Sequence, residues 1–200
     1  MPTSSTSAFS DPRDFESALR RYKIARLIPT QAVGFRARLT DIRLNQLALL
    51  AARENVSRTA TVSASAGQTL MVFAMTKTGA QYWTERRLGL GELVVISGPA
   101  QSTWRIHAPA RWGAILVPAR VLIDCLHTIA GEQAQVPATG LTIGRPPWSA
   151  FRELLALHWA AVHCTVRQPE APVETEAARA LEQQLLVSLA DVLGPAVTCN

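Results

Sequence analysis

The segment GELVVISGPAQSTWRIH, residues 91–107, decides the fold. Two runs rich in β-branched and aromatic residues, 92–97 and 103–107, flank a Gly-Pro turn signal, so the segment predicts two successive short strands. A small β-barrel that holds a transition metal needs imidazoles two residues apart on one strand, with a third imidazole and a carboxylate nearby. His107 is the only histidine in this segment, and it lies at the far end. We therefore expect a barrel without a metal.

The same alternation of apolar and polar residues extends outward over residues 35–117. Phe35, Ala37 and Leu39, for example, alternate with polar residues, and turn signals recur about every ten residues. Segment 45–53 is ambiguous, because LALLAARE favours a helix by propensity while its neighbours favour a strand. The segments predicted as strands are 35–40, 45–53, 56–62, 68–75, 81–86, 92–97, 103–107 and 112–117. This pattern predicts an all-β barrel or a double-sheet jelly roll.

The first residues are polar and rich in serine and threonine, and we expect residues 1–14 to form a disordered tail. Asp11 and Pro12 have the chemistry of a helix N-cap and a first helical residue, with Phe15 and Leu19 at helical spacing behind them, which predicts a short leading helix. No secretion signal and no apolar run of about 18 residues is present, so we expect a cytoplasmic protein that does not enter a membrane.

The last third of the chain has helical periodicity. Helices are predicted over residues 118–130, from Pro146-Pro147 to about Val162, and from about Val173 to Leu193. We expect a barrel domain over 15–117 and, over 118–200, a helical dimerisation region in which an antiparallel helix pair follows the barrel.

The final helix carries apolar residues beyond those that one packing stripe needs, and we expect it to join two copies of the chain as a homodimer. Packing of this helix onto its own barrel is the alternative. The candidate dimerisation residues are Leu181, Leu185, Leu186, Leu189 and Leu193.

Other chemistry is weakly indicated. His158 and His163 are five residues apart on a predicted helix and therefore point about 140° away from each other, which disfavours a shared metal. The three cysteines are far apart and odd in number, so no disulfide framework is expected. Because nucleophile motifs, phosphate loops and paired carboxylates are also missing, we expect no cofactor and no enzymatic activity.

Charge is unevenly distributed along the chain. Residues 1–117 contain 15 basic and 7 acidic residues, whereas residues 118–200 contain 5 basic and 8 acidic residues. Arg36 and Arg38 occupy alternate positions of one predicted strand. Three interpretations remain open: a solvated outer surface, an arginine inside the barrel that clamps a ligand carboxylate, and a basic outer face near DNA phosphates.

Aromatic residues of the predicted strands indicate a small-molecule site. If they point into the barrel, they form an apolar pocket with polar rims; a filled core without a cavity is the alternative. The candidate interior residues for ligand binding are Phe35, Arg36, Arg38, Met71, Phe73, Trp104, His107 and Trp112.

Three stretches together, FESALRRYKIARLIPTQAVGFRARLTDIRL, LGLGELVVISGPAQSTWRIHAPARWGAILVP and ALEQQLLVSLADVL, resemble the N-terminal regulatory half of AraC-family transcription regulators. The resemblance implies a cupin-like barrel, often without a metal, that binds a small effector, followed by helices that dimerise. The family reads DNA with two helix-turn-helix units, which this chain lacks, so DNA binding is expected only for a longer parent.

The leading hypothesis is therefore an effector-sensing and dimerisation domain without its DNA-binding half. Whether the chain is a domain of a longer protein, a truncated product or a natural stand-alone protein stays open. Two alternatives remain: a stand-alone cupin-fold domain that binds a small molecule or acts as an enzyme, and an antagonist that forms mixed dimers with a full-length regulator.

Overall fold

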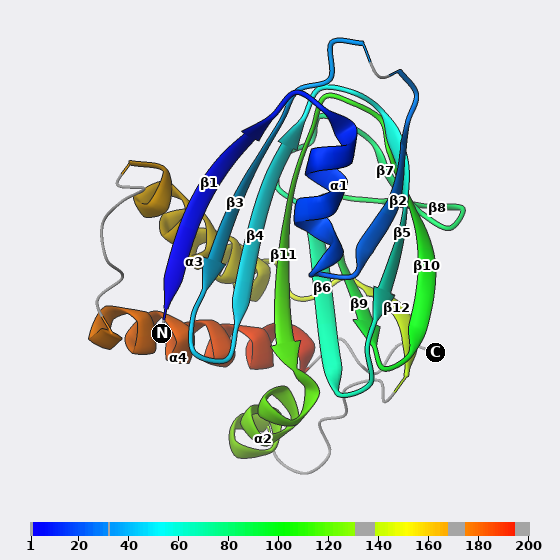
Figure 1. Cartoon of the computed structure of the whole chain (residues 1–200). Coiled ribbons are helices and arrows are strands. Elements are labelled where there is room, and N and C mark those ends of the chain that lie inside the picture. Colours follow the sequence, from blue (N-terminus) through cyan, green and yellow to red (C-terminus); the bar gives the residue numbers. More distant parts are fainter. Residues whose placement is uncertain (1, 32, 131–138, 168–174, 195–200) are drawn as a thin grey trace.

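The structure is a computed structural model that describes residues 2–31, 33–130, 139–167 and 175–194, and it consists mainly of two facing antiparallel β-sheets (Figure 1). In chain order the elements are β1 (Thr3–Phe9), α1 (Pro12–Arg20), β2 (Ile24–Pro29), β3 (Ala37–Arg43), β4 (Ala48–Glu54), β5 (Arg58–Ala64), β6 (Gln68–Ala74), β7 (Gln81–Trp83), β8 (Arg86–Leu88), β9 (Leu93–Ser97), β10 (Ala100–Ile106), β11 (Ala110–Pro118), α2 (Ala119–Ala130), β12 (Gly140–Gly144), α3 (Trp148–Arg167) and α4 (Thr175–Leu193). The seven-stranded sheet has the order β1-β3-β4-β11-β6-β9-β12 and the five-stranded sheet the order β2-β5-β10-β7-β8. The predicted class, a jelly-roll-like β structure with helices, is confirmed.

The two predicted strands of the opening segment are β9 and β10. They lie in different sheets, so the chain crosses from one sheet to the other at Gly98, whose φ of 66° a glycine adopts without strain. The ambiguous segment forms β4, an interior strand that pairs with β3 on one side and β11 on the other. Pairing on both edges outweighs the helical propensity of LALLAARE.

The prediction of a disordered tail over residues 1–14 was wrong. β1 pairs with β3 from Thr3 to Phe9, and the hydroxyls of Thr6 and Thr40 are 3.1 Å apart. Threonine and serine tolerate the exposed edge of a sheet, so a polar composition there does not prevent a strand. The leading helix is confirmed as α1, with the Asp11 carboxylate accepting a hydrogen bond from the backbone N–H of Arg13 at 2.7 Å.

The helical region differs from the predicted helix pair. α2, α3 and α4 follow the barrel, with α4 packed against both others, and β12 returns between α2 and α3 to pair with β9. In the described residues the final helix begins at Thr175; the predicted start near Val173 lies outside them. Among the described residues no helix is both long and apolar enough to span a membrane.

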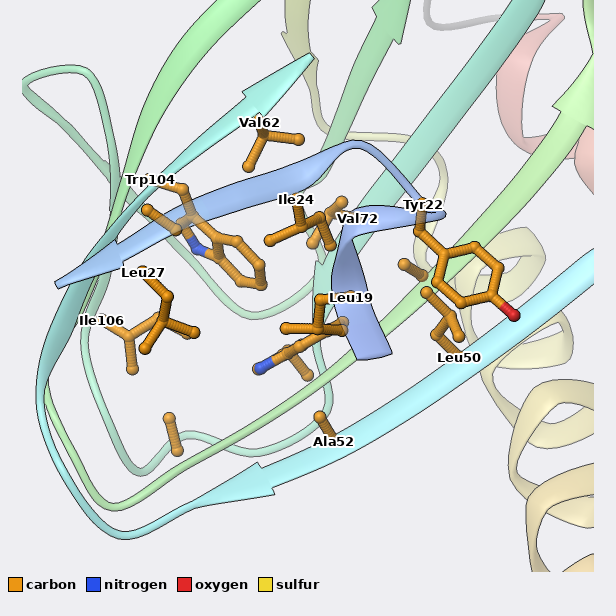
Figure 2. Close-up of a cluster of buried hydrophobic side chains, with 14 of the residues drawn as sticks. Leu19, Tyr22, Ile24, Leu27, Leu50, Ala52, Val62, Val72, Trp104 and Ile106 are labelled. Carbon is orange, nitrogen blue, oxygen red and sulfur yellow. The ribbon is translucent and has the colours of Figure 1, made fainter. Parts of the chain in front are cut away.

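The seven-stranded sheet separates two apolar clusters. The inner cluster lies between the sheets and includes Phe15 and Leu19 of α1, which lies across the space between β2 and the seven-stranded sheet (Figure 1). Figure 2 shows Leu19, Leu50 and Trp104 pointing into this interior from α1, β4 and β10. The outer cluster lies between the other face of the same sheet and the three C-terminal helices. Because each large apolar side chain contributes about 1.5–3 kcal/mol when buried, barrel and helices form one folded unit.

Candidate functional site

A charged pair lies inside the barrel. Arg58, the first residue of β5, donates two hydrogen bonds to the carboxylate of Glu54, the last residue of β4, from Nε to Oε2 at 2.7 Å and from Nη2 to Oε1 at 2.9 Å. Both side chains are fully buried. Trp112 of β11 donates a further bond from Nε1 to Glu54 Oε1 at 2.6 Å. A bidentate pair with a third donor compensates for much of the desolvation of the two charges.

Tryptophan rings surround this pair. The Arg58 guanidinium lies 4.4 Å from the Trp104 ring centroid, in the range of a cation–π interaction. Trp83 stacks on Trp104 with centroids 5.1 Å apart and an interplanar angle of 15°, and Trp112 meets Trp104 edge-on at 4.8 Å. The cross-strand pairing of Trp104 with Trp83 produces the stack, because paired residues share one face of the sheet. Planar apolar surface therefore adjoins a fixed guanidinium.

Several polar atoms of this cluster have no hydrogen-bond partner among the described residues. They are Arg58 Nη1, both amide atoms of Gln81, and the indole nitrogens of Trp83 and Trp104. A buried donor or acceptor left unpaired costs about 1–3 kcal/mol, and native proteins leave few of them. Their concentration at one place, with four N–H donors and a single acceptor, is the chemistry of a site that receives an acceptor group. We call Glu54, Arg58, Gln81, Trp83, Trp104 and Trp112 the interior polar cluster.

Three of the predicted interior residues lie inside the barrel: Phe35, Trp104 and Trp112 belong to the inner cluster and are almost completely buried. Trp104 and Trp112 join the interior polar cluster, whereas Phe35 packs on Phe15 with ring centroids 5.8 Å apart. Their role in ligand binding stays a prediction.

The interior placement of the other candidates was wrong. Arg36, Arg38 and His107 are exposed, because their alternating neighbours take the inward positions. Met71 and Phe73 are buried in the outer cluster, beneath the C-terminal helices. β6 is buried on both faces, so its continuous apolar run carries no alternation that would have told inside from outside.

Glu54, Arg58, Gln81 and Trp83 were missed. A signal existed for Arg58, because Val56, Arg58, Ala60 and Val62 alternate with polar residues and three of these four are apolar. An arginine in the inward series of a strand indicates a buried charge. For Gln81 and Trp83 the segment is too short to define an inward series.

The predicted dimerisation stripe is largely used within the chain. Leu185, Leu189 and Leu193 are buried in the outer cluster against the sheet and neighbouring helices. Leu181 and Leu186 are partly buried and pack against the same cluster. Because Leu185, Leu189 and Leu193 are buried within the chain, they cannot contact a partner, and their assignment to a dimer interface was wrong. The sheet face that they cover is itself apolar, so the helix buries its apolar stripe there.

His158 of α3 is a packed core residue. Its Nε2 donates to the carbonyl oxygen of Leu50 at 2.9 Å, and its ring meets Phe73 edge-on at 5.1 Å. Burial lowers the pKa of His158 to about 4, against a smaller opposing effect of hydrogen bonds to the backbone of Leu50 and Ala114. Over the described part of the chain, no three His, Cys, Asp or Glu side chains are grouped so that they could hold a metal ion.

Neither a family model nor a curated protein sequence matches the chain. Among solved structures the chain is similar to the AraC-like transcriptional activator CuxR, with a TM-score of 0.62 and 12% identity over 94% of this chain and 70% of that one. The EutQ protein of Clostridium difficile overlaps at a TM-score of 0.29, with 16% identity over 43% of this chain and 71% of that one. A variant of Bacillus subtilis oxalate decarboxylase overlaps at 0.30, with 9% identity over 48% and 28%. The last two overlaps are too loose to carry an argument, and the first shows that this chain shares the fold of that activator.

Proposed function

We propose that this chain is the regulatory part of an AraC-type transcription regulator, which senses a small effector inside the barrel and pairs with a second copy through its helices. The similarity to an AraC-like activator over 94% of the chain, helices included, carries the proposal. DNA contact is left to a helix-turn-helix domain, whether on the same chain or on a partner. The role is one of recognition, without conversion of the ligand.

The interior polar cluster supports the sensing half of this proposal. Its four unpaired N–H donors favour an effector with a carboxylate or carbonyl oxygen, and its stacked rings favour a flat apolar body. Because the interior is filled by Phe15, Leu19 and the tryptophans, the effector has to displace side chains to enter. Such binding shifts the domain to a second arrangement, which is the property a sensor needs.

The sensing test uses aromatic carboxylic acids and their carboxamide and unsubstituted parent rings as probes. A ligand at 100 times its dissociation constant adds about 2.7 kcal/mol of stability, which a thermal-shift assay detects. Gln81→Met keeps the side-chain length but removes two unpaired polar atoms, so it should stabilise the free protein and weaken binding of the acid. Gln101→Met on the exposed part of β10 is the matched control. Equal binding by wild type and Gln81→Met would place the effector elsewhere.

The dimerisation half of the proposal rests on apolar residues that the fold leaves uncovered. Ile123 and Ile129 of α2 are 37% and 41% exposed, and Val187 of α4 is 43% exposed. α2 and α4 pack against each other, with Cys125 Sγ 3.4 Å from the carbonyl oxygen of Leu186. We therefore propose that the dimer interface lies on the outer faces of α2 and α4, and not on the buried leucines of α4.

Sedimentation equilibrium tests this interface. Ile123→Glu and Val187→Glu should each weaken a dimer while leaving the thermal transition of the monomer nearly unchanged. Val166→Glu is the control, because Val166 is 39% exposed on α3. A wild-type protein that stays monomeric at high micromolar concentration, or equal weakening by Val166→Glu, would contradict this part of the proposal.

A further inference from the structure

Three arginines form a row across the outer face of the seven-stranded sheet. In the register of the sheet, Arg38 of β3 lies directly opposite Arg53 of β4, and Arg53 lies directly opposite Arg111 of β11. Their sequence neighbours belong to the inner cluster or the interior polar cluster, so the three guanidinium groups point outward. We call Arg38, Arg53 and Arg111 the arginine row.

Two hollows adjoin this row, and Arg38 and Arg53 line both of them. One has a volume of about 540 Å³ and is lined by Arg36, Arg38, Arg53 and Asn55 together with the end of β1. The other, about 180 Å³, is lined by the whole row and by Trp159 and Val166 of α3, both of which are substantially exposed. Among the described residues that line the two hollows, none is acidic.

The described part of the chain places no counter-charge beside the arginine row. Within the described ranges, none of its three guanidinium groups lies within 4.0 Å of a carboxylate, whereas Arg20, Arg21, Arg43 and Arg58 all do. Like charges directly opposite each other on neighbouring strands destabilise a sheet. Three such arginines in succession repel one another, and the binding of an anion lowers this repulsion.

We propose that the arginine row is an anion site that binds two linked phosphate groups. Directly opposed residues of neighbouring strands are about 5 Å apart, so adjacent guanidinium forks fit successive phosphates of a diphosphate, each in a bidentate arrangement. The diphosphate comes either as the inorganic ion or as part of a nucleotide, whose base would lie against the half-exposed Trp159 ring. The site is outside the barrel and does not depend on the proposed effector.

Isothermal titration calorimetry at low salt tests the site with inorganic diphosphate, ADP and adenosine. Wild-type protein should bind the first two and not adenosine. Arg53→Gln removes the central fork and should weaken diphosphate binding about ten- to hundredfold, the range expected for a lost charge-assisted contact. Arg53→Glu should abolish binding while the thermal transition in phosphate-free buffer stays the same or rises. Arg179→Gln, an exposed arginine of α4, is the control and should bind as wild type does.

The probes also separate the sources of the phosphate. Tighter binding of ADP than of diphosphate, lost in Trp159→Ala, identifies a nucleotide; equal binding identifies the diphosphate alone. Absence of binding by either at millimolar concentration, or equal weakening in Arg179→Gln, would overturn the proposal. So would a short DNA duplex that binds the row more tightly than both, since the row would then be a contact for the nucleic-acid backbone.

Discussion

Glu182 of α4 accepts a hydrogen bond from the backbone N–H of Asn45, 137 residues away, at 2.7 Å. The same oxygen accepts a second bond from Gln46 N at 3.1 Å. The carboxylate is almost completely buried, so these backbone donors in the turn between β3 and β4 compensate for its desolvation. This contact fixes the position of α4 along the sheet and mechanically couples the barrel to the helices.

Replacing Glu182 by alanine should therefore lower the free energy of unfolding by about 1.5–3 kcal/mol, because two hydrogen bonds from backbone N–H groups to a buried carboxylate are lost. Urea denaturation measures the change. Glu153→Ala, at an exposed position of α3, should change stability by less than about 0.5 kcal/mol. Equal losses in the two variants would mean that the contact with the turn contributes nothing.

His158 should make stability depend on pH. Its pKa is lowered from 6.5 to about 4 in the folded protein, so between these values the unfolded chain binds more protons than the folded chain. Stability contributed by the neutral imidazole is thus complete above about pH 6.5 and is lost as the pH falls toward 4, on the order of 3 kcal/mol in total. Urea denaturation at a series of pH values measures this. His158→Gln should flatten the curve in this window; an unchanged slope would assign it to other groups.

The buried pair Glu54–Arg58 should respond asymmetrically to substitution. Glu54→Gln or Arg58→Met alone leaves a buried charge without its partner and should destabilise the protein by about 3–5 kcal/mol. The double variant removes both charges and should recover much of that loss. Chemical denaturation of the four proteins gives the coupling energy. Additive losses would show that the two charges do not stabilise each other.

Leu189 and Val187 are two residues apart on α4 but should behave differently. Leu189→Ala should lower stability by about 2–5 kcal/mol, because the side chain is fully buried in the outer cluster. Val187→Ala should change the stability of the monomer by less than about 0.5 kcal/mol. Thermal denaturation of dilute protein measures both. A large loss in Val187→Ala would show that its side chain is covered.

The arginine row should lower the stability of the free protein. Arg53→Glu places a carboxylate opposite both Arg38 and Arg111 and should raise the free energy of unfolding in phosphate-free buffer by about 0.2–1 kcal/mol for each pair formed. The gain should shrink as the salt concentration rises, because the side chains are at the surface. A salt-independent gain would point to packing and not to charge.

Alternation was sufficient to predict most of the barrel, because strands such as β5 have one face inside and one outside. It failed wherever a strand lacked that contrast. β6 is buried on both faces, so its sequence could not show that Met71 and Phe73 face the helices and not the barrel interior. β1 is a polar edge strand, and its composition is the same as that of a disordered tail.

The helices show the other limit of the sequence. A leucine stripe specifies that a surface is buried but not what buries it, so Leu185 and Leu189 indicated a partner where the outer sheet face was the actual contact. The interior polar cluster depends on pairings between strands far apart in sequence, such as Trp83 with Trp104, and local patterns do not reveal these.

The return of β12 to the edge of β9 limits how the protein can be dissected. A fragment that stops at residue 118 would lack this edge strand. It would also expose the apolar sheet face, with Met71, Phe73 and Ile115, that the helices cover in the full chain. Such a fragment should aggregate instead of folding as an independent domain. A shortened version of the protein should therefore retain all residues through Leu193, where α4 ends.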